Sequence, residues 1–262
     1  TTLRKKFKND PQGLKIAEKL LAYDTGKKFW KSNEICMRHA EGIRSNTPVL
    51  AKLWYFWTNH FTISDTQSLA NFSTGAYQRE FIRANMDKKF ETMAIDATIA
   101  WPMMMHLDNK DNIGPKSKSA KSEWRRREKK PATINENHAR ELLELHTVSP
   151  NASYTQEDII ELAKIMTGWR PKWSKQKDHG HDVSFDTDRH EPGKNNIFGK
   201  VYKRGSKSLK IVIKDLANHP SCREFIATKL CRYLITDNPT KDMIMPIIKA
   251  WEKSDGYLPE VH

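Results

Sequence analysis

Apolar residues recur at spacings of three and four along most of the chain, which is the repeat of one buried face of an α-helix. This pattern predicts helices over residues 12–23, 28–43, 48–61, 77–99, 135–146, 156–166, 207–217, 220–235 and 240–253. The segments 183–185 and 197–202 contain β-branched and aromatic residues, so we expect them to pair as short strands. The predicted fold class is therefore all-α, a compact multi-helix domain with a short β-hairpin.

Two of these helices also carry terminal signals. Thr47 has the position of an N-cap for the helix 48–61, and a proline follows it at the first helical position. Thr155 and Asp158 have the spacing of a capping box for the helix 156–166. Capping therefore explains the polar residues at the start of this second helix.

Long polar connections interrupt the predicted helices at residues 109–134 and 170–206. Connections of this length in a compact domain are usually functional or disordered. We expect residues 45–262 to form the main helical domain. Residues 1–44 form an N-terminal helical segment, which can belong to the same domain.

The connections hold much of the positive charge, and the whole chain has a formal net charge of +13. Residues 110–130 contain nine Lys or Arg and three acids, and residues 200–214 contain six basic residues and no acid. Such an excess attracts polyanions, because each phosphate contact releases counterions. Alternatively, these loops only increase solubility. The candidate contacts in the first loop are Arg125, Arg126 and Arg127.

The sequence lacks the signature motifs of several common classes of protein. The sequence has no GxxxxGK[ST] or GxGxxG loop and no GxSxG or HExxH motif. Cys36, Cys222 and Cys231 are widely spaced and suggest neither a disulfide framework nor a thiolate zinc site. The chain as given has no apolar run of the roughly eighteen residues that span a membrane, and no signal peptide. These features favour a cytoplasmic location.

The predicted helix 135–146, NENHARELLELH, is the segment with the most suggestive chemistry. Glu141 and Glu144 share one face, and His146 lies just beyond them. Two carboxylates held close together raise one pKa and attract a cation, so this face is a candidate catalytic or metal site. The alternative is a solvated face on which Arg140 pairs with the acids four residues away on either side.

Two other segments contain candidate ligands. His60 ends an apolar helix, where a histidine is either a core residue with satisfied hydrogen bonds or a ligand. The segment 179–194, HGHDVSFDTDRHEPGK, combines histidines and carboxylates at short spacings that suit a divalent metal, although a surface loop can bind metal adventitiously. Its candidate ligands are His179, His181, Asp182, Asp186, Asp188, His190 and Glu191.

Six segments occur in an order that resembles the bacterial domain-of-unknown-function family 1800. They are WTNHFTIS, YQREFIRANMDKKFETM, PMMMHLDN, NENHARELLELHT, YTQEDIIELAKIMTGW and RHEPGKNNIFGK, within about residues 45–232. An ordered match of six blocks is far more specific than a single motif. The resemblance implies a mostly helical domain, often longer than this chain, without an agreed activity.

The family pattern carries over to particular positions of this sequence. They are His60, Asp108, Asn109, Asn135, Glu136, Asn137, Arg140, Glu141, Glu144, His146, Thr167, Gly168, Trp169, His190 and Lys194. The chain departs from the family at Glu191, where aspartate is usual, and at His138, where tyrosine is usual. The resemblance therefore gives His138 no catalytic part.

Two hypotheses of function remain open. The first is an enzyme or small-ligand-binding domain with an inward polar site that holds a divalent cation. Its predicted catalytic residues are Glu141, Glu144, His146 and His60, its metal ligands Glu141, Glu144, His146 and His190, and its further ligand-binding residues Asn135, Asn137, Arg140 and Lys194. In this hypothesis Glu141 and Glu144 point toward His60, because a buried histidine needs a polar partner.

The second hypothesis is a non-catalytic basic helical module. It binds nucleic acid, another polyanion or a protein partner through the loops at 110–130 and 200–214, with Arg125, Arg126 and Arg127 among the contacts. In this case the polar residues of the helix 135–146 only tie helices together.

Overall fold

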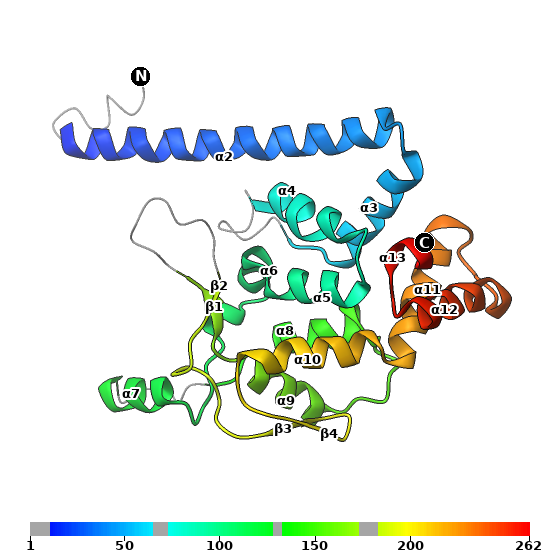
Figure 1. Cartoon of the computed structure of the whole chain (residues 1–262). Helices are drawn as coiled ribbons and strands as arrows, with labels where there is room; N and C mark the ends of the chain where they lie inside the picture. Colours follow the sequence, from blue (N-terminus) through cyan, green and yellow to red (C-terminus); the bar gives the residue numbers. More distant parts are fainter. Residues whose placement is uncertain (1–10, 65–72, 128–132, 173–182) are drawn as a thin grey trace.

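The computed structural model describes residues 11–64, 73–127, 133–172 and 183–262. Its α-helices are α2 (Pro11–Arg44), α3 (Pro48–His60), α4 (Thr74–Tyr77), α5 (Phe90–Ile99), α6 (Trp101–His106), α7 (Lys118–Arg127), α8 (Asn137–Glu141), α9 (Gln156–Met166), α10 (Ser206–Ala217), α11 (Pro220–Leu234), α12 (Lys241–Ser254) and α13 (Leu258–Val261). Helix α2 extends along one side of a body formed by the others (Figure 1). The predicted all-α class is confirmed.

Shorter helical turns continue or connect these helices. The π-helix η2 (Gln78–Ile82) and the 3-10 helix η3 (Arg83–Asn85) follow α4. The 3-10 helix η4 (Asn109–Asp111) follows α6, and the π-helix η5 (Leu142–His146) continues α8.

Within the described residues, four three-residue strands form two separate antiparallel hairpins. Strand β1 (Trp169–Pro171) pairs with β2 (Val183–Phe185), and β3 (Asn195–Ile197) pairs with β4 (Lys200–Tyr202). The predicted pairing of 183–185 with 197–202 is therefore wrong, although both segments contain strands. The two residues between β3 and β4, Phe198 and Gly199, both have positive φ, as a tight type I′ turn requires, so β4 pairs with its nearest neighbour.

The core lies where α3, α5 and α12 meet. Trp57, Phe90 and Trp251 are almost completely buried, and the Phe90 ring lies 5.5 Å from Trp57 and 5.0 Å from Trp251 between centroids. Burial of each such side chain contributes roughly 1.5–3 kcal/mol. Helix α10 covers α5 with its own apolar stripe, so the body closes around these aromatic residues.

Five helices begin and end within one residue of their predicted bounds, namely α3, α9, α10, α11 and α12. The capping box between Thr155 and Asp158 is present. In contrast, the helices predicted at 12–23 and 28–43 are the single helix α2, which contains Gly26. No helix among the described residues is long and apolar enough to cross a membrane.

The helix predicted over 77–99 is interrupted by hydrogen bonds to a distant part of the chain. The backbone N–H of Phe90 donates to the carbonyl of Gly256, and the carbonyl of Lys88 accepts from Leu258 N–H. These bonds to the C-terminal segment replace helical ones, so the chain turns before α5 begins.

A further correction is α7, a helix inside the connection predicted at 109–134. It has good helix formers but no regular apolar stripe, so periodicity did not detect it.

Candidate functional site

Four asparagines, Asn109, Asn112, Asn135 and Asn137, form a hydrogen-bonded group that we call the asparagine network. The side-chain amide of Asn109 donates to the carbonyls of Met166 (3.2 Å) and Trp169 (2.9 Å). The amide of Asn112 donates to the Asn109 Oδ1 (3.1 Å) and its own Oδ1 accepts from the Asn135 N–H (3.1 Å). Asn109 and Asn112 are buried, so these bonds fix the end of α9 against η4.

Asn135 and Asn137 extend this network to the start of α8. The Asn135 side chain donates to the carbonyl of Asp108 (3.3 Å) and accepts from the Asn137 N–H (3.0 Å). The Asn137 side chain donates to the carbonyl of Leu107 (3.4 Å). Both predicted ligand-binding asparagines are therefore engaged within the fold.

Arg140 ties one face of α8 and η5 to α9. Its guanidinium contacts Glu136 (3.2 Å) and Glu144 (3.3 Å), each one turn away, and donates to Gln156 Oε1 (2.9 Å). These ion pairs are the alternative, predicted from the sequence, to a catalytic or metal site at Glu141 and Glu144. Burial, then the nearby Glu144 carboxylate, raises the pKa of Glu141.

His60 is buried, but its polar partners are not the predicted glutamates. Its Nε2–H donates to the carbonyl of His146 (3.1 Å), and its Nδ1 accepts from the Lys229 ammonium (2.9 Å). Neither Glu141 nor Glu144, which we expected to point toward His60, is a hydrogen-bond partner of its ring among the described residues. A backbone carbonyl and a lysine of α11, a helix distant in sequence, satisfy the ring instead.

His146 and His138 lie nearby and are also buried. The His60 and His146 rings are 6.1 Å apart between centroids. The Nδ1 of His146 and both ring nitrogens of His138 have no hydrogen-bond partner among the described residues. Burial lowers the pKa of His138 and of His146 to about 3, so both rings are neutral at pH 7. We call His60, His138, His146 and Lys229 the histidine–lysine cluster.

His190 connects the two hairpins rather than joining this cluster. Its Nδ1–H donates to the carbonyl of Thr167 (2.8 Å), and its Nε2 accepts from Gly205 N–H (3.2 Å). The Thr167 hydroxyl accepts from the N–H of Glu191 (2.8 Å). The bonds of His190 and Glu191 therefore hold the segment before β1 and the segment after β4 together. Both ring nitrogens of His190 are occupied by these bonds.

The predicted metal set of Glu141, Glu144, His146 and His190 is consequently not brought together. Across residues 11–64, 73–127, 133–172 and 183–262, no group of three or more His, Cys, Asp or Glu is placed to hold a metal ion. The candidate ligands His179, His181 and Asp182 lie outside the described residues. Lys194 is exposed on the loop before β3. Arg125, Arg126 and Arg127 occupy the last turn of α7.

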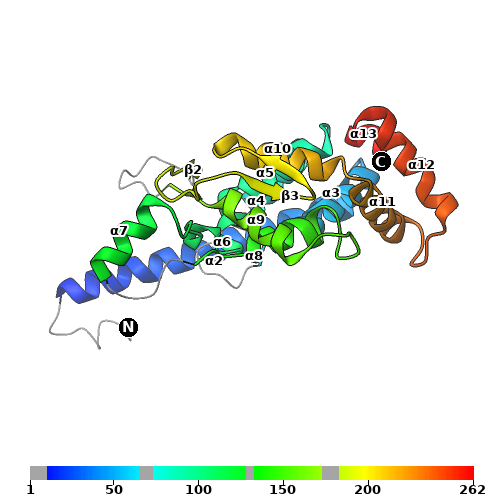
Figure 2. The ribbon, with the colours of Figure 1, turned by 90° about the horizontal axis from the view of Figure 1, so that it is seen from below.

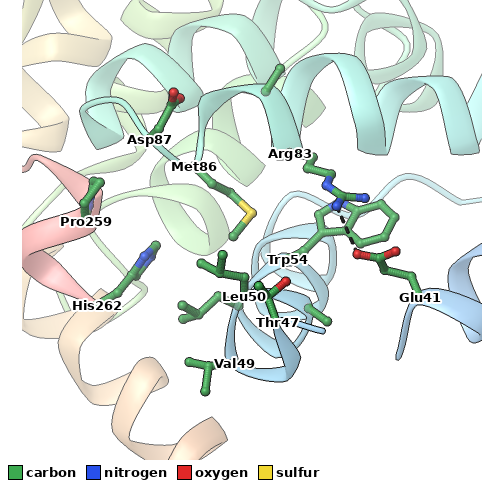
Figure 3. A pocket seen from close by; sticks show the side chains of 13 residues that line it. Glu41, Thr47, Val49, Leu50, Trp54, Arg83, Met86, Asp87, Pro259 and His262 are labelled. Carbon is green, nitrogen blue, oxygen red and sulfur yellow. Dashed lines mark hydrogen bonds and ion pairs between the residues drawn. The ribbon is translucent and has the colours of Figure 1, made fainter. Parts of the chain in front are cut away.

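A pocket of about 560 Å³ opens at the corner between α2 and α3 (Figure 3). The residues that line it are Glu41, Thr47, Val49, Leu50, Ala51, Leu53, Trp54, Arg83, Ala84, Met86, Asp87, Pro259 and His262. Val49 and Leu50 are 65% and 53% exposed, unlike the buried residues farther along α3. The wall is therefore apolar and accessible.

Charged groups stand at the edge of this pocket. Arg83 forms an ion pair with Glu41 (3.0 Å), and its guanidinium carbon lies 5.0 Å from the centroid of the Trp54 ring. The indole N–H of Trp54 donates to the carbonyl of Gln78 (3.0 Å), which fixes the ring. Asp87 is exposed, and the described part of the chain offers it no ion-pair partner.

The sequence did not indicate this pocket. The apolar residues that α3 contributes follow the helical repeat, which predicts only that one face of this helix is buried. The signal that was present is that Val49 and Leu50 are adjacent, directly after Pro48, so that both cannot lie at the centre of one buried stripe.

A family model described as "Protein of unknown function (DUF1800)" matches residues 10–262. The chain belongs to this family. The match includes the whole of α2 and continues past the end of α13, beyond the stretch of about 45–232 on which the resemblance rested. No curated protein and no solved structure matches the chain. Membership of DUF1800 thus leaves the function to be argued from the site.

Proposed function

We propose that this DUF1800 domain binds a small, mainly apolar ligand in the pocket between α2 and α3. The observation that carries this proposal is an accessible cavity of about 560 Å³ whose walls include Val49, Leu50, Trp54 and Met86. Small-molecule sites are typically concave, about 300–1,000 Å³ in volume, and lined by apolar side chains with a few polar groups. A ligand that covers Val49 and Leu50 removes exposed apolar surface from water, which favours binding.

The polar groups at the rim suggest which ligands bind best. Arg83 is already neutralised by Glu41, whereas no described residue forms an ion pair with Asp87. A ligand with an amine near Asp87 gains an exposed ion pair, a contribution of up to about 1 kcal/mol. We therefore propose an apolar molecule whose charged group, if it has one, is positive.

Binding of the neutral apolar dye Nile red tests the proposal. Ala84→Trp places an indole in the pocket from an exposed position of η3, so we expect the dissociation constant to rise by at least about tenfold, or about 1.4 kcal/mol. Ala40→Trp is the matched control, because Ala40 is an exposed residue of α2 that does not line the pocket. Equal affinity of wild type and both variants, or no binding by wild type, contradicts the proposal.

The charge preference is tested separately with 4-phenylbutylamine and 4-phenylbutan-1-ol, which differ in their polar end group. We expect wild type to prefer the amine by up to about fivefold and Asp87→Asn to lose that preference. Unchanged preference in Asp87→Asn refutes the role of Asp87 without refuting the pocket.

A second candidate function is polyanion binding by α7. The observation that favours it is the position of α7, which lies at the end of the molecule opposite α12 and α13 (Figure 2). Its sequence, KSAKSEWRRR, contains five basic residues and one acid. A projecting basic helix is accessible to a phosphate backbone, which rewards each basic contact through counterion release.

Retention on a heparin column tests this second candidate. We expect the triple variant Arg125→Ala, Arg126→Ala, Arg127→Ala to remain folded and to elute at lower salt, because it loses three positive charges that can contact phosphate groups. The control removes three exposed lysines of α12 that have no ion pair within the described residues, Lys241, Lys249 and Lys253. If both triple variants lose retention equally, only net charge matters and α7 is not a binding element.

A further inference from the structure

Lys229 is a half-buried cation without a counter-charge. Its ammonium contacts the Nδ1 of His60 (2.9 Å) and lies 5.1 Å from the centroid of the Phe225 ring. No carboxylate in the described parts of the chain forms an ion pair with it. Removing an ammonium from water without a partner is costly, so this arrangement needs an explanation.

Two other partly buried lysines of this protein contact carboxylates. Lys110, with 26% of its side chain exposed, contacts both Asp108 (2.6 Å) and Asp111 (3.3 Å). Lys164, with 27% exposed, contacts both Glu161 and Glu157. Each of these lysines contacts two carboxylates, whereas Lys229 contacts none within the described part of the chain.

The histidines around Lys229 do not supply negative charge. His60 is neutral, because its Nε2–H donates to the His146 carbonyl while its Nδ1 accepts from Lys229. His146 is buried and neutral as well. Burial and then the Lys229 charge keep the pKa of both rings low. The site is therefore an ammonium held by a neutral ring, with further N–H groups left to donate.

We propose that the Lys229 ammonium is the anchor of a binding site for a small oxyanion, such as a free phosphate or the carboxylate of a ligand. His60 acts as a positioning residue that holds the ammonium through its Nδ1. An anion at this position supplies the missing counter-charge, as the paired aspartates do for Lys110. In a half-buried setting, such a charge-assisted hydrogen bond is stronger than one in water.

Protection of Lys229 from acetylation tests the proposal directly in the wild-type protein. The rate of labelling by acetic anhydride at Lys229 is measured by mass spectrometry, with inorganic phosphate or acetate added and ionic strength held constant with sodium chloride. At an anion concentration about ten times the dissociation constant, we expect labelling of Lys229 to slow roughly tenfold. Lys210, an exposed lysine of α10 with no ion-pair partner among the described residues, serves as the internal control and should be unaffected.

Thermal shift with variants gives the second readout. Inorganic phosphate should raise the melting temperature of wild type and of Lys210→Met in a saturable way, but not that of Lys229→Met. A response to phosphate alone identifies a phosphate site, and an equal response to acetate identifies a general oxyanion site. Uniform labelling of Lys229 and Lys210 at every anion concentration, or an unchanged phosphate response in Lys229→Met, overturns the proposal.

Discussion

The asparagine network and the histidine–lysine cluster are built from similarly polar sequence blocks but differ in how their buried groups are satisfied. The Asn109 and Asn112 side chains both donate to backbone carbonyls, and the Asn112 amide also donates to the Asn109 side-chain oxygen. In the cluster, by contrast, the ring nitrogens of His138 lack partners and Lys229 lacks a carboxylate among the residues that the structure describes. Buried polar groups in native proteins nearly always form hydrogen bonds. The bonds of the asparagine network therefore account for its buried side chains as parts of the fold, whereas the bonds of the histidine–lysine cluster do not.

The two regions should differ most in how their stability depends on pH, because only the cluster contains buried groups that take up protons near neutrality when the protein unfolds. The folded-state pKa of His138 and His146, about 3, lies below the unfolded value of about 6.5. Each histidine therefore contributes stability that is fully present above pH 6.5 and is lost as pH falls toward 3. The expected loss is on the order of 1.4 kcal/mol per pH unit for each histidine.

Urea unfolding between pH 7 and pH 5 checks this expectation in a range where most carboxylates stay ionised. The slope of the unfolding free energy should correspond to at least two protons taken up on unfolding. The variant His138→Phe should reduce that slope by about one proton. A free energy of unfolding that stays constant from pH 7 to pH 5 would show that these histidines are not buried as described.

Removal of a member of the asparagine network should have the next largest effect. Asn109→Leu keeps the number and branching of the side-chain heavy atoms but leaves the carbonyls of Met166 and Trp169 without their donor. We expect a loss of roughly 2–4 kcal/mol in the free energy of unfolding, since two buried groups become unsatisfied. Asn151→Leu, at an exposed turn, is the control and should change it by less than about 0.5 kcal/mol. Equal effects of the two substitutions would contradict the network.

The Arg140 ion pairs should contribute least. Glu144→Gln removes one carboxylate from a guanidinium that keeps Glu136 and Gln156, and all of these side chains are partly exposed. We expect a decrease of no more than about 1 kcal/mol, since exposed pairs contribute little. Melting curves with EDTA and with added Mg²⁺ should coincide for both proteins. Metal-dependent stabilisation of wild type that Glu144→Gln abolishes would instead support a cation site here.

The sequence predicted the helices that have strong apolar repeats and caps. The bounds of α3 and α9 followed from Pro48 and the Thr155 cap, which act locally. The break before α5 was not predictable, because the bonds that stop the helix come from Gly256 and Leu258, far along the chain. Local patterns therefore gave the helices but not the turns between them.

The candidate site was predicted only in part. His60 and His146 were singled out and do lie together, because each ends a helix with a buried apolar face. Their partner Lys229 was missed, since a lysine on a helix of mixed polarity gives no local signal. Glu144 was assigned to the same site, although the i,i+4 spacing to Arg140 already favoured an ion pair.

The effect of His138→Phe on stability at pH 7 tests the main conclusion most directly. This conclusion is that some polar residues of one sequence block form hydrogen bonds that hold the fold together, whereas others are buried without hydrogen-bond partners. His138 is completely buried and neither ring nitrogen has a partner in the described structure, so an apolar ring of similar shape should fit. The account predicts an unfolding free energy that is unchanged or raised by up to about 2 kcal/mol. A loss as large as that expected for Asn109→Leu would show that His138 is bonded in solution and would contradict this conclusion.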